Sequence, residues 1–149
     1  MKTTAVVSTS PEWTESYAAR LASRCAGGTV LALYGNLGAG KSVFARGFAC
    51  GLGITEPVTS PTFALVQDYH CPDRRLFVHA DMYRINDPLE IVGTGLEEHL
   101  FAPDTITMVE WAEQIEHALL PDRPDARLLR VTLEHVEEQQ RTISIEWPD

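Results

Sequence analysis

The residues with the most recognisable chemistry form the segment Gly35-Asn-Leu-Gly-Ala-Gly-Lys-Ser42. Its spacing matches G-x-x-x-x-G-K-[ST], the pattern of a loop that holds nucleotide phosphates. The glycines permit backbone angles closed to other residues, so main-chain N–H groups can approach phosphate oxygens. Lys41 supplies a compact positive charge, and the Ser42 hydroxyl is suited to a magnesium ion. The segment predicts binding of a nucleoside diphosphate or triphosphate.

The elements expected on either side place this loop in the right context. Thr29–Tyr34 is an apolar run typical of a buried strand, and residues 42–52 have the apolar spacing of a helix. A helix that begins at the loop adds its partial positive charge to the site. These neighbours argue against the alternative, a glycine-rich turn that matches the pattern by chance. The residues expected to contact the nucleotide are Gly35, Asn36, Leu37, Gly38, Ala39, Gly40, Lys41, Ser42 and Val43.

Hydrolysis would need further groups, and two acids stand where a magnesium-shell acid is usually found. Asp81 and Glu110 each end a short apolar run. In open α/β sheets the ligand lies beyond the carboxyl ends of the parallel strands, so a strand parallel to Thr29–Tyr34 would bring its acid to the loop. The alternative for either acid is a helix cap or an ion pair with arginine. His79 alternates with Asp81 and so faces the same side, where a hydrogen-bonded structural histidine is the commoner outcome.

Three other features have both a functional and a structural interpretation. The segment that contains Thr59, Ser60 and Thr62 is either a switch that senses phosphate or a connection stiffened by proline. Arg84 either stabilises phosphoryl charge or forms a surface ion pair. Trp111 is either a core residue or a lid over the nucleotide.

Charge and composition limit the function classes. The formal net charge is −9, with Lys2 and Lys41 as the only lysines and Arg74-Arg75 as the densest basic cluster. Proteins that bind nucleic acid unaided usually carry a basic stripe, so we expect contact with RNA or DNA only through a partner. No apolar run is long enough to span a membrane, and the N-terminus lacks a signal-like segment, so we expect a cytoplasmic protein without membrane contact.

The three cysteines support the same expectation. They are odd in number and widely spaced, so we expect them to be reduced, two buried in helices and one in a turn. The sequence positions are Cys25, Cys50 and Cys71.

The remaining patterns predict one α/β domain over residues 1–149, a P-loop NTPase fold with a mixed parallel and antiparallel sheet flanked by helices. A helix should begin with Thr9 or Ser10 as its cap and Pro11 in its first turn. It should stop at Gly27-Gly28, and its apolar face should carry Trp13, Tyr17, Leu21 and Cys25. Antiparallel hairpins are expected from strands 64–70 and 76–81 and from strands 127–136 and 141–147, the latter joined by loop 137–140. Between them we expect two short helices in 86–101 broken at 93–95, a strand over Thr105–Glu110 and a helix over 111–120. An edge strand is expected near residues 3–7.

Four motifs in this order resemble those of the TsaE family, also called YjeE. They are the loop above, the segment Val58-Thr-Ser-Pro-Thr-Phe63, the segment His79-Ala-Asp-Met-Tyr-Arg84, and the segment Val109-Glu-Trp-Ala-Glu113. The loop is generic, whereas the other segments at these distances are specific, and the likeness spans nearly the whole chain except the C-terminal hairpin. Two departures, Ser42 for the more usual Thr and Ile85 for the more usual Leu, are conservative.

The resemblance implies a small cytoplasmic ATPase that binds ATP and Mg²⁺ and works with the proteins TsaD and TsaB. In that family TsaD transfers a threonylcarbamoyl group to the adenosine beside the tRNA anticodon, and the TsaE ATPase supports turnover of the complex. Carried over by position, Lys41 serves the phosphates, Ser42 and Glu110 hold magnesium, and Asp81 is an acid needed for hydrolysis. Thr59, Ser60 and Thr62 fall in a switch-like segment, and Trp111 lies beside the nucleotide.

Two other functions compete with this one. A P-loop small-molecule kinase would need an acceptor pocket and commonly an arginine-bearing lid, for which the sequence offers only Arg84 and Arg74-Arg75. A nucleotide-dependent interaction switch would bind ATP and barely hydrolyse it alone. No N-K-x-D segment, the guanine-reading pattern, is present, which favours adenine.

Overall fold

A seven-stranded mixed sheet organises the molecule, with strand order β1-β7-β6-β2-β5-β4-β3. The computed structural model describes residues 2–36, 38–58, 66–119 and 127–148. The elements, in chain order, are β1 (Lys2–Ser8), α1 (Pro11–Ala22), β2 (Thr29–Tyr34), α2 (Lys41–Gly51), β3 (Val66–His70), β4 (Leu76–Asp81), the 3₁₀ helices η1 (Pro88–Thr94) and η2 (Leu96–Glu98), β5 (Thr105–Glu110), the 3₁₀ helix η3 (Ala112–Leu119), β6 (Arg127–Glu137) and β7 (Gln140–Trp147).

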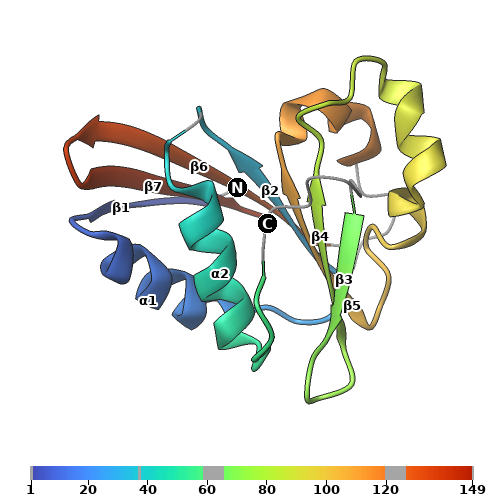
Figure 1. Ribbon diagram of the computed structural model, residues 1–149, viewed down its shortest axis with the longest axis horizontal. Helices are drawn as coiled ribbons and strands as arrows, with labels where there is room; N and C mark the ends of the chain where they lie inside the picture. Colours follow the sequence, from blue (N-terminus) through green and yellow to red (C-terminus); the bar gives the residue numbers. More distant parts are fainter. Residues whose placement is uncertain (1, 37, 59–65, 120–126, 149) are drawn as a thin grey trace.

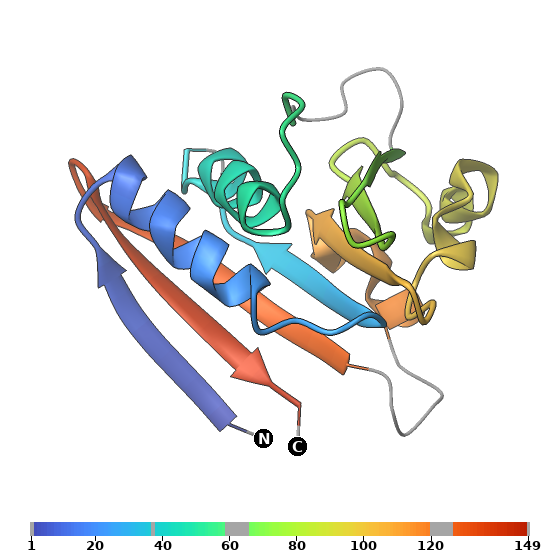
Figure 2. The same ribbon diagram turned by 90° about the horizontal axis from the view of Figure 1, so that it is seen from below.

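The centre of the sheet is parallel and its margins are antiparallel. Strand β2 pairs in parallel with β5 and β6, and β4 pairs in parallel with β5. The hairpins β3–β4 and β6–β7 are antiparallel, as the sequence predicts, and β1 is an edge strand antiparallel to β7. Strands β1 and β7 therefore lie side by side, and the two ends of the chain meet at the same margin (Figure 2).

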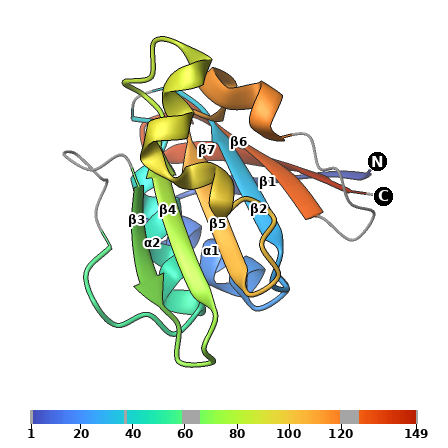
Figure 3. The ribbon, with the colours of Figure 1, turned by 90° about the vertical axis from the view of Figure 1, so that its right-hand side faces the viewer.

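Helices cover the two faces of the sheet differently. Helices α1 and α2 lie side by side over one face, and η1 to η3 lie on the other (Figures 1 and 3). Strand β2 has a buried side chain on both faces because Leu31 and Leu33 pack in the cluster with α1 and α2, whereas Val30 and Ala32 pack in the cluster with the 3₁₀ helices. A strand covered on both faces is a continuous apolar run, which is why Thr29–Tyr34 does not alternate.

Helix α1 begins as predicted and ends earlier than expected. Ser10 is the N-cap, and its side chain accepts a hydrogen bond from the Trp13 backbone N–H at 3.1 Å. The helix ends at Ala22, so Cys25 lies beyond it, and Trp13 and Tyr17 are only partly buried. Its buried residues are Thr14, Ala18, Leu21 and Ala22, which shifts the buried face by about one residue from the predicted one.

The segments predicted as short helices form 3₁₀ helices, and the first two are separated within 93–95, as predicted. The break between η1 and η2 falls at Gly95, which has a φ of 78° in the left-handed region. Trp111 precedes η3 instead of opening it, and η3 is kinked at Ile115. The closing hairpin turns at residues 138–139, a tighter turn than predicted.

The cysteines are all free, but they are buried differently from the prediction. Cys25 and Cys71 are buried, whereas Cys50, on α2, is exposed. Burial raises the pKa of the Cys25 thiol to about 11. None of the helices in the described parts of the chain is both long and apolar enough to cross a membrane.

Candidate nucleotide site

The loop between β2 and α2 has the backbone that a phosphate cradle needs. Gly35, Gly38 and Gly40 have φ values of 146°, 83° and 99°, in the region that side chains rarely adopt. A Cβ at Gly35 would stand 2.5 Å from the Leu133 carbonyl oxygen, so the first glycine is also needed for close approach to β6. Leu37, the remaining predicted contact in the middle of the loop, lies outside the described residues.

Lys41 opens α2 and is directed into the site although it is buried, with 6% of its surface exposed. Its Nζ donates to the Gly35 carbonyl oxygen and lies 3.7 Å from the centroid of the Trp111 ring. Burial lowers the pKa of this ammonium group, while the nearby carboxylates of Glu110, Glu113 and Asp81 raise it. The lysine is therefore a desolvated cation within reach of three carboxylates, a group ready to pair with phosphate.

The two acids singled out by the sequence lie next to each other. Asp81 and Glu110 are partners in the β4–β5 ladder, and Glu110 is in turn the partner of Leu33 in β2. Both strands run parallel to β2, so both acids reach the end of the sheet where the loop begins. Burial raises the pKa of Asp81, the charge of Glu110 adds to the rise, and a 2.9 Å hydrogen bond from the Tyr83 backbone N–H opposes it.

His79 holds the carboxylate of Glu110. Its Nε2 lies 2.6 Å from Glu110 Oε2, and the side chains are 1% and 4% exposed. An ionised carboxylate only accepts hydrogen bonds, so Nε2 carries the proton. Nδ1 is buried without a hydrogen-bond partner among the described residues. His79 is therefore hydrogen-bonded through one ring nitrogen only, so the expectation of a satisfied histidine is met in part, and its partner Glu110 lines the cavity beside the loop.

For Trp111 the structure supports the core interpretation in part, and a lid over the nucleotide stays a prediction. It packs partly against the core on the 3₁₀ side, and its ring lies over Lys41. Its other contact is Tyr83, with ring centroids 4.8 Å apart. The backbone φ of Trp111 is 57°, in the left-handed region, so the residue turns sharply between β5 and η3. This turn is why the side chain faces the loop.

These groups converge on one cavity of about 360 Å³. It is lined by Gly38, Gly40, Lys41, Ser42, Val43, Asp81, Glu110, Trp111 and Arg141. The loop, the ends of β4 and β5 and the start of β7 thus contribute to a single space. Thr59, Ser60 and Thr62 lie outside the described residues, and Arg84 is exposed.

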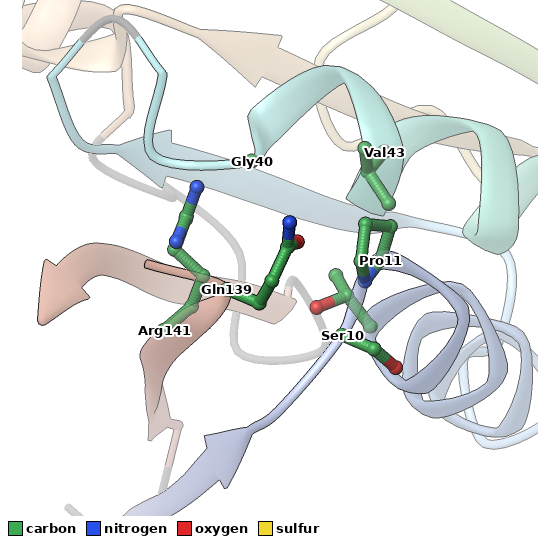
Figure 4. Close-up of a pocket in the computed structure, with 7 residues that line it drawn as sticks. Ser10, Pro11, Gly40, Val43, Gln139 and Arg141 are labelled. Atoms are coloured by element: carbon green, nitrogen blue, oxygen red, sulfur yellow. The ribbon is translucent and has the colours of Figure 1, made fainter. Parts of the chain in front are cut away.

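Arg141 is the residue that sequence reasoning missed. It comes from β7, and its Nη2 donates to the Gly38 carbonyl oxygen at 3.1 Å. The same side chain borders a smaller hollow beside the start of α1, where Ser10, Pro11, Gln139 and Val43 face one another (Figure 4). Val43 is only partly covered and lines both the cavity and the smaller hollow, so the start of α1 lies next to the candidate site without lining it. No motif in the C-terminal hairpin marked the arginine.

The oxygen donors of the cavity fit a magnesium ion. The Ser42 hydroxyl and the carboxylates of Glu110 and Asp81 line the same space. Mg²⁺ prefers oxygen ligands, keeps several waters, and is usually held by one or two carboxylates together with substrate phosphates. The described residues include no group of three or more His, Cys, Asp or Glu that could hold a metal ion. The donor set suits an ion shared with a nucleotide.

A strand, a glycine loop ending in Lys41-Ser42, a helix, and acids at the ends of neighbouring parallel strands define a P-loop protein of the α/β class. Residues 8–149 match the family model described as "Threonylcarbamoyl adenosine biosynthesis protein TsaE". The chain belongs to the TsaE family, whose role is in the biosynthesis of tRNA threonylcarbamoyladenosine.

Individual relatives are similar to this chain over most of their length. The tRNA threonylcarbamoyladenosine biosynthesis protein TsaE of Bacillus subtilis (strain 168) is 39% identical over 134 residues, 90% of this chain and 79% of that protein. The protein of the same name from Rickettsia bellii (strain RML369-C) is 35% identical over 139 residues, 91% and 90% of the two chains. The crystal structure of Bacillus subtilis YdiB superimposes with a TM-score of 0.77 at 32% identity, covering 97% of this chain and 84% of that one.

Proposed function

We propose that this chain, as one P-loop ATPase domain, binds and hydrolyses Mg-ATP and thereby supports turnover of a complex of TsaD and TsaB. The observation that carries the proposal is the convergence of Lys41, Ser42, Asp81 and Glu110 on one cavity beside the glycine loop. A P-loop supplies phosphate binding, and an acid beside it supplies the part that hydrolysis requires.

The roles follow from position. The loop N–H groups and the N-terminus of α2 bind phosphate oxygens, and Lys41 moves from the Gly35 carbonyl and Trp111 to the phosphates. Ser42 and Glu110 hold the magnesium ion, which when bound neutralises charge that develops on the phosphates. His79 keeps Glu110 oriented.

Two further residues act from the rim of the cavity. Asp81, whose pKa is raised by burial, is the acid that orients or deprotonates the attacking water. Arg141 already reaches the loop carbonyl of Gly38 and so lies where it could contact the nucleotide.

Two substitutions test the nucleotide site. Lys41→Ala should abolish ATP binding, because it removes the cation directed into the cavity. Glu110→Ala should retain binding and lower magnesium-dependent hydrolysis by about 100-fold or more, the size of effect seen when one group that stabilises transition-state charge is lost. Nucleotide titration and phosphate release measure the two effects.

The chain offers matched controls for both substitutions. Lys2, the only other lysine, is exposed on β1, and Glu137 is exposed at the end of β6. Lys2→Ala and Glu137→Ala should bind and hydrolyse ATP as the parent does. Unchanged hydrolysis in Lys41→Ala or Glu110→Ala would contradict the site assignment.

Reconstitution tests the role in the complex. Multiple-turnover threonylcarbamoylation of tRNA by TsaD and TsaB should rise when this chain and ATP are added, and Lys41→Ala should not support the rise. Turnover that is equal with and without the chain would contradict the proposed role. Phosphate transfer from ATP to a small metabolite without partners would favour the kinase instead.

A further inference from the structure

Exposed apolar side chains are concentrated in one short segment. The large hydrophobic side chains exposed among the described residues are Val7, Tyr83, Leu89, Val92 and Val136. Three of these five lie between residues 83 and 92, with exposed fractions of 51%, 74% and 68% for Tyr83, Leu89 and Val92. Single exposed apolar residues are ordinary, whereas a local concentration marks an interaction surface.

The helix η1 presents two of these side chains on one side. In a 3₁₀ helix residues three apart are eclipsed, so Leu89 and Val92 point in the same direction. Asp87 caps the helix in a reciprocal capping box with Glu90, and Ile91 is 1% exposed in the core below. The helix is fixed at its start and along its buried side, and its two most exposed apolar residues are held outward.

Exposed acidic side chains flank this apolar pair in the chain. Asp87, Glu90, Glu97 and Glu98 are exposed, the sequence has no lysine or arginine from residue 85 to 104, and the nearest cation before this segment is the exposed Arg84. Such a surface repels nucleic acid and anionic lipid, because both present dense negative charge. A protein pocket with an apolar floor and a basic rim would be complementary both to the exposed apolar side chains and to the acidic residues near them.

The surface is linked to the nucleotide site through a short series of contacts. The Tyr83 backbone N–H donates to Asp81, and the Tyr83 ring packs on Trp111, which in turn lies over Lys41. Four residues separate Tyr83 from the start of η1. A partner seated here would touch a residue that contacts the ring over Lys41.

We propose that Tyr83, Leu89 and Val92, the η1 surface, dock a protein partner through an apolar pocket rimmed by lysine or arginine. The inference rests on the proposed function, in which that partner is the complex of TsaD and TsaB. The η1 surface is then where this chain meets the complex, and Tyr83 connects the contact to the nucleotide site.

Binding measurements with purified TsaD and TsaB in the presence of ATP test the inference. The double substitution Leu89→Ser with Val92→Ser should weaken binding at least about tenfold, because the loss of central apolar anchors has effects of this size. Its control is Val7→Ser with Val136→Ser, which removes two other exposed apolar side chains, from β1 and β6, and should leave binding unchanged. Both variants should keep the parent's nucleotide affinity and thermal midpoint, which shows that the fold and site are intact.

A charge variant tests the predicted rim. Glu97→Lys with Glu98→Lys should weaken binding more at low salt than at high salt, because salt screens exposed charges. If this variant binds with the same affinity at both salt concentrations, the prediction that the partner's pocket has a basic rim is wrong.

The outcomes separate the two proposals. If the parent chain binds and the Leu89/Val92 variant binds equally well, the η1 surface is not the docking site, while the proposed function stands. If the parent chain fails to bind under every nucleotide condition, the proposed partnership itself is wrong. Equal weakening by the Val7/Val136 control would show a general effect of lost apolar surface and would also overturn the η1 surface.

Discussion

Lys41 is held between a backbone carbonyl and an aromatic ring, and a phosphate group would have to draw it away from both. Its Nζ donates to Gly35 and lies over Trp111. A cation over an aromatic face is stabilised by about 0.5–2 kcal/mol, which is less than a charge-assisted pairing with phosphate can supply. The ring therefore positions the lysine without competing strongly with the ligand.

The hydrogen bond between His79 and Glu110 should be needed to orient the Glu110 carboxylate. His79→Leu should leave the buried Glu110 carboxylate without its donor and lower magnesium-dependent phosphate release about 10- to 100-fold, as is usual when a residue supporting a metal ligand is lost. Phosphate release measured across magnesium concentrations, with nucleotide affinity measured in parallel, is the appropriate assay.

The conservative variant separates positioning from packing. His79→Gln retains an N–H donor and should recover part of the activity and lower the magnesium requirement relative to His79→Leu. Equal behaviour of the leucine and glutamine variants would show that the histidine serves only to fill space beside Phe77, on which its ring stacks.

At the scale of elements, the contact between α1 and α2 depends on two glycines. A Cβ at Gly47 would stand 2.4 Å from the Glu15 carbonyl oxygen, and a Cβ at Gly51 would stand equally close to that of Ala19. These are backbone atoms, which cannot move aside as a side chain can. The close approach allows α1 to lie directly against α2, with its start beside the loop.

Gly47→Ala should therefore destabilise the protein by about 1–3 kcal/mol, the usual cost of overpacking. The higher helix propensity of alanine alone would raise the free energy of unfolding by about 1 kcal/mol. A net decrease in stability would therefore come from the clash of the new Cβ with the backbone of α1. Gly93→Ala is the control, because a Cβ there meets nothing within 4 Å and the backbone φ is not positive. Chemical denaturation of both variants measures the difference, and equal stability would contradict the close-packing argument.

At the scale of the whole molecule, the charge distribution opposes direct contact with tRNA. The net charge is −9, and several arginines are paired within the chain: Arg46 with Glu15, Arg75 with Asp73, and Arg130 with Glu116. Of the densest basic pair in the sequence, Arg75 also donates to the Cys25 carbonyl oxygen. These pairs reduce the positive charge that the described surface offers to phosphates.

The isolated chain should bind tRNA more weakly than about 10⁻⁴ M at physiological salt, the weak end of non-specific protein–nucleic acid affinity. Fluorescence anisotropy with labelled tRNA measures this, and the same tRNA with the reconstituted TsaD and TsaB complex is the positive control. Salt-sensitive binding of the isolated chain at micromolar concentration would contradict the prediction.

Most of the fold could be predicted from local patterns. Apolar runs and alternation gave the strands, and Ser10 with Pro11 gave the start of α1, because these signals depend on neighbouring residues. The 3₁₀ form of η1 to η3 and the kink of η3 at Ile115 could not be predicted, since 3₁₀ and α-helical turns differ by one residue and the choice depends on packing against the sheet. The exposure of Cys50 likewise depends on which face of α2 the sheet covers.

The sequence by itself determined the glycine loop, the lysine and serine that end it, and the acids at the ends of two strands, because each is encoded by spacing along the chain. Only the tertiary structure decided that both acids flank the loop, since this requires that β4 and β5 run parallel to β2. It also brought Arg141 to Gly38 across 103 residues, and His79 to Glu110 across 31. Such contacts have no local signature, because strand order and direction are set by the burial of both faces of the sheet.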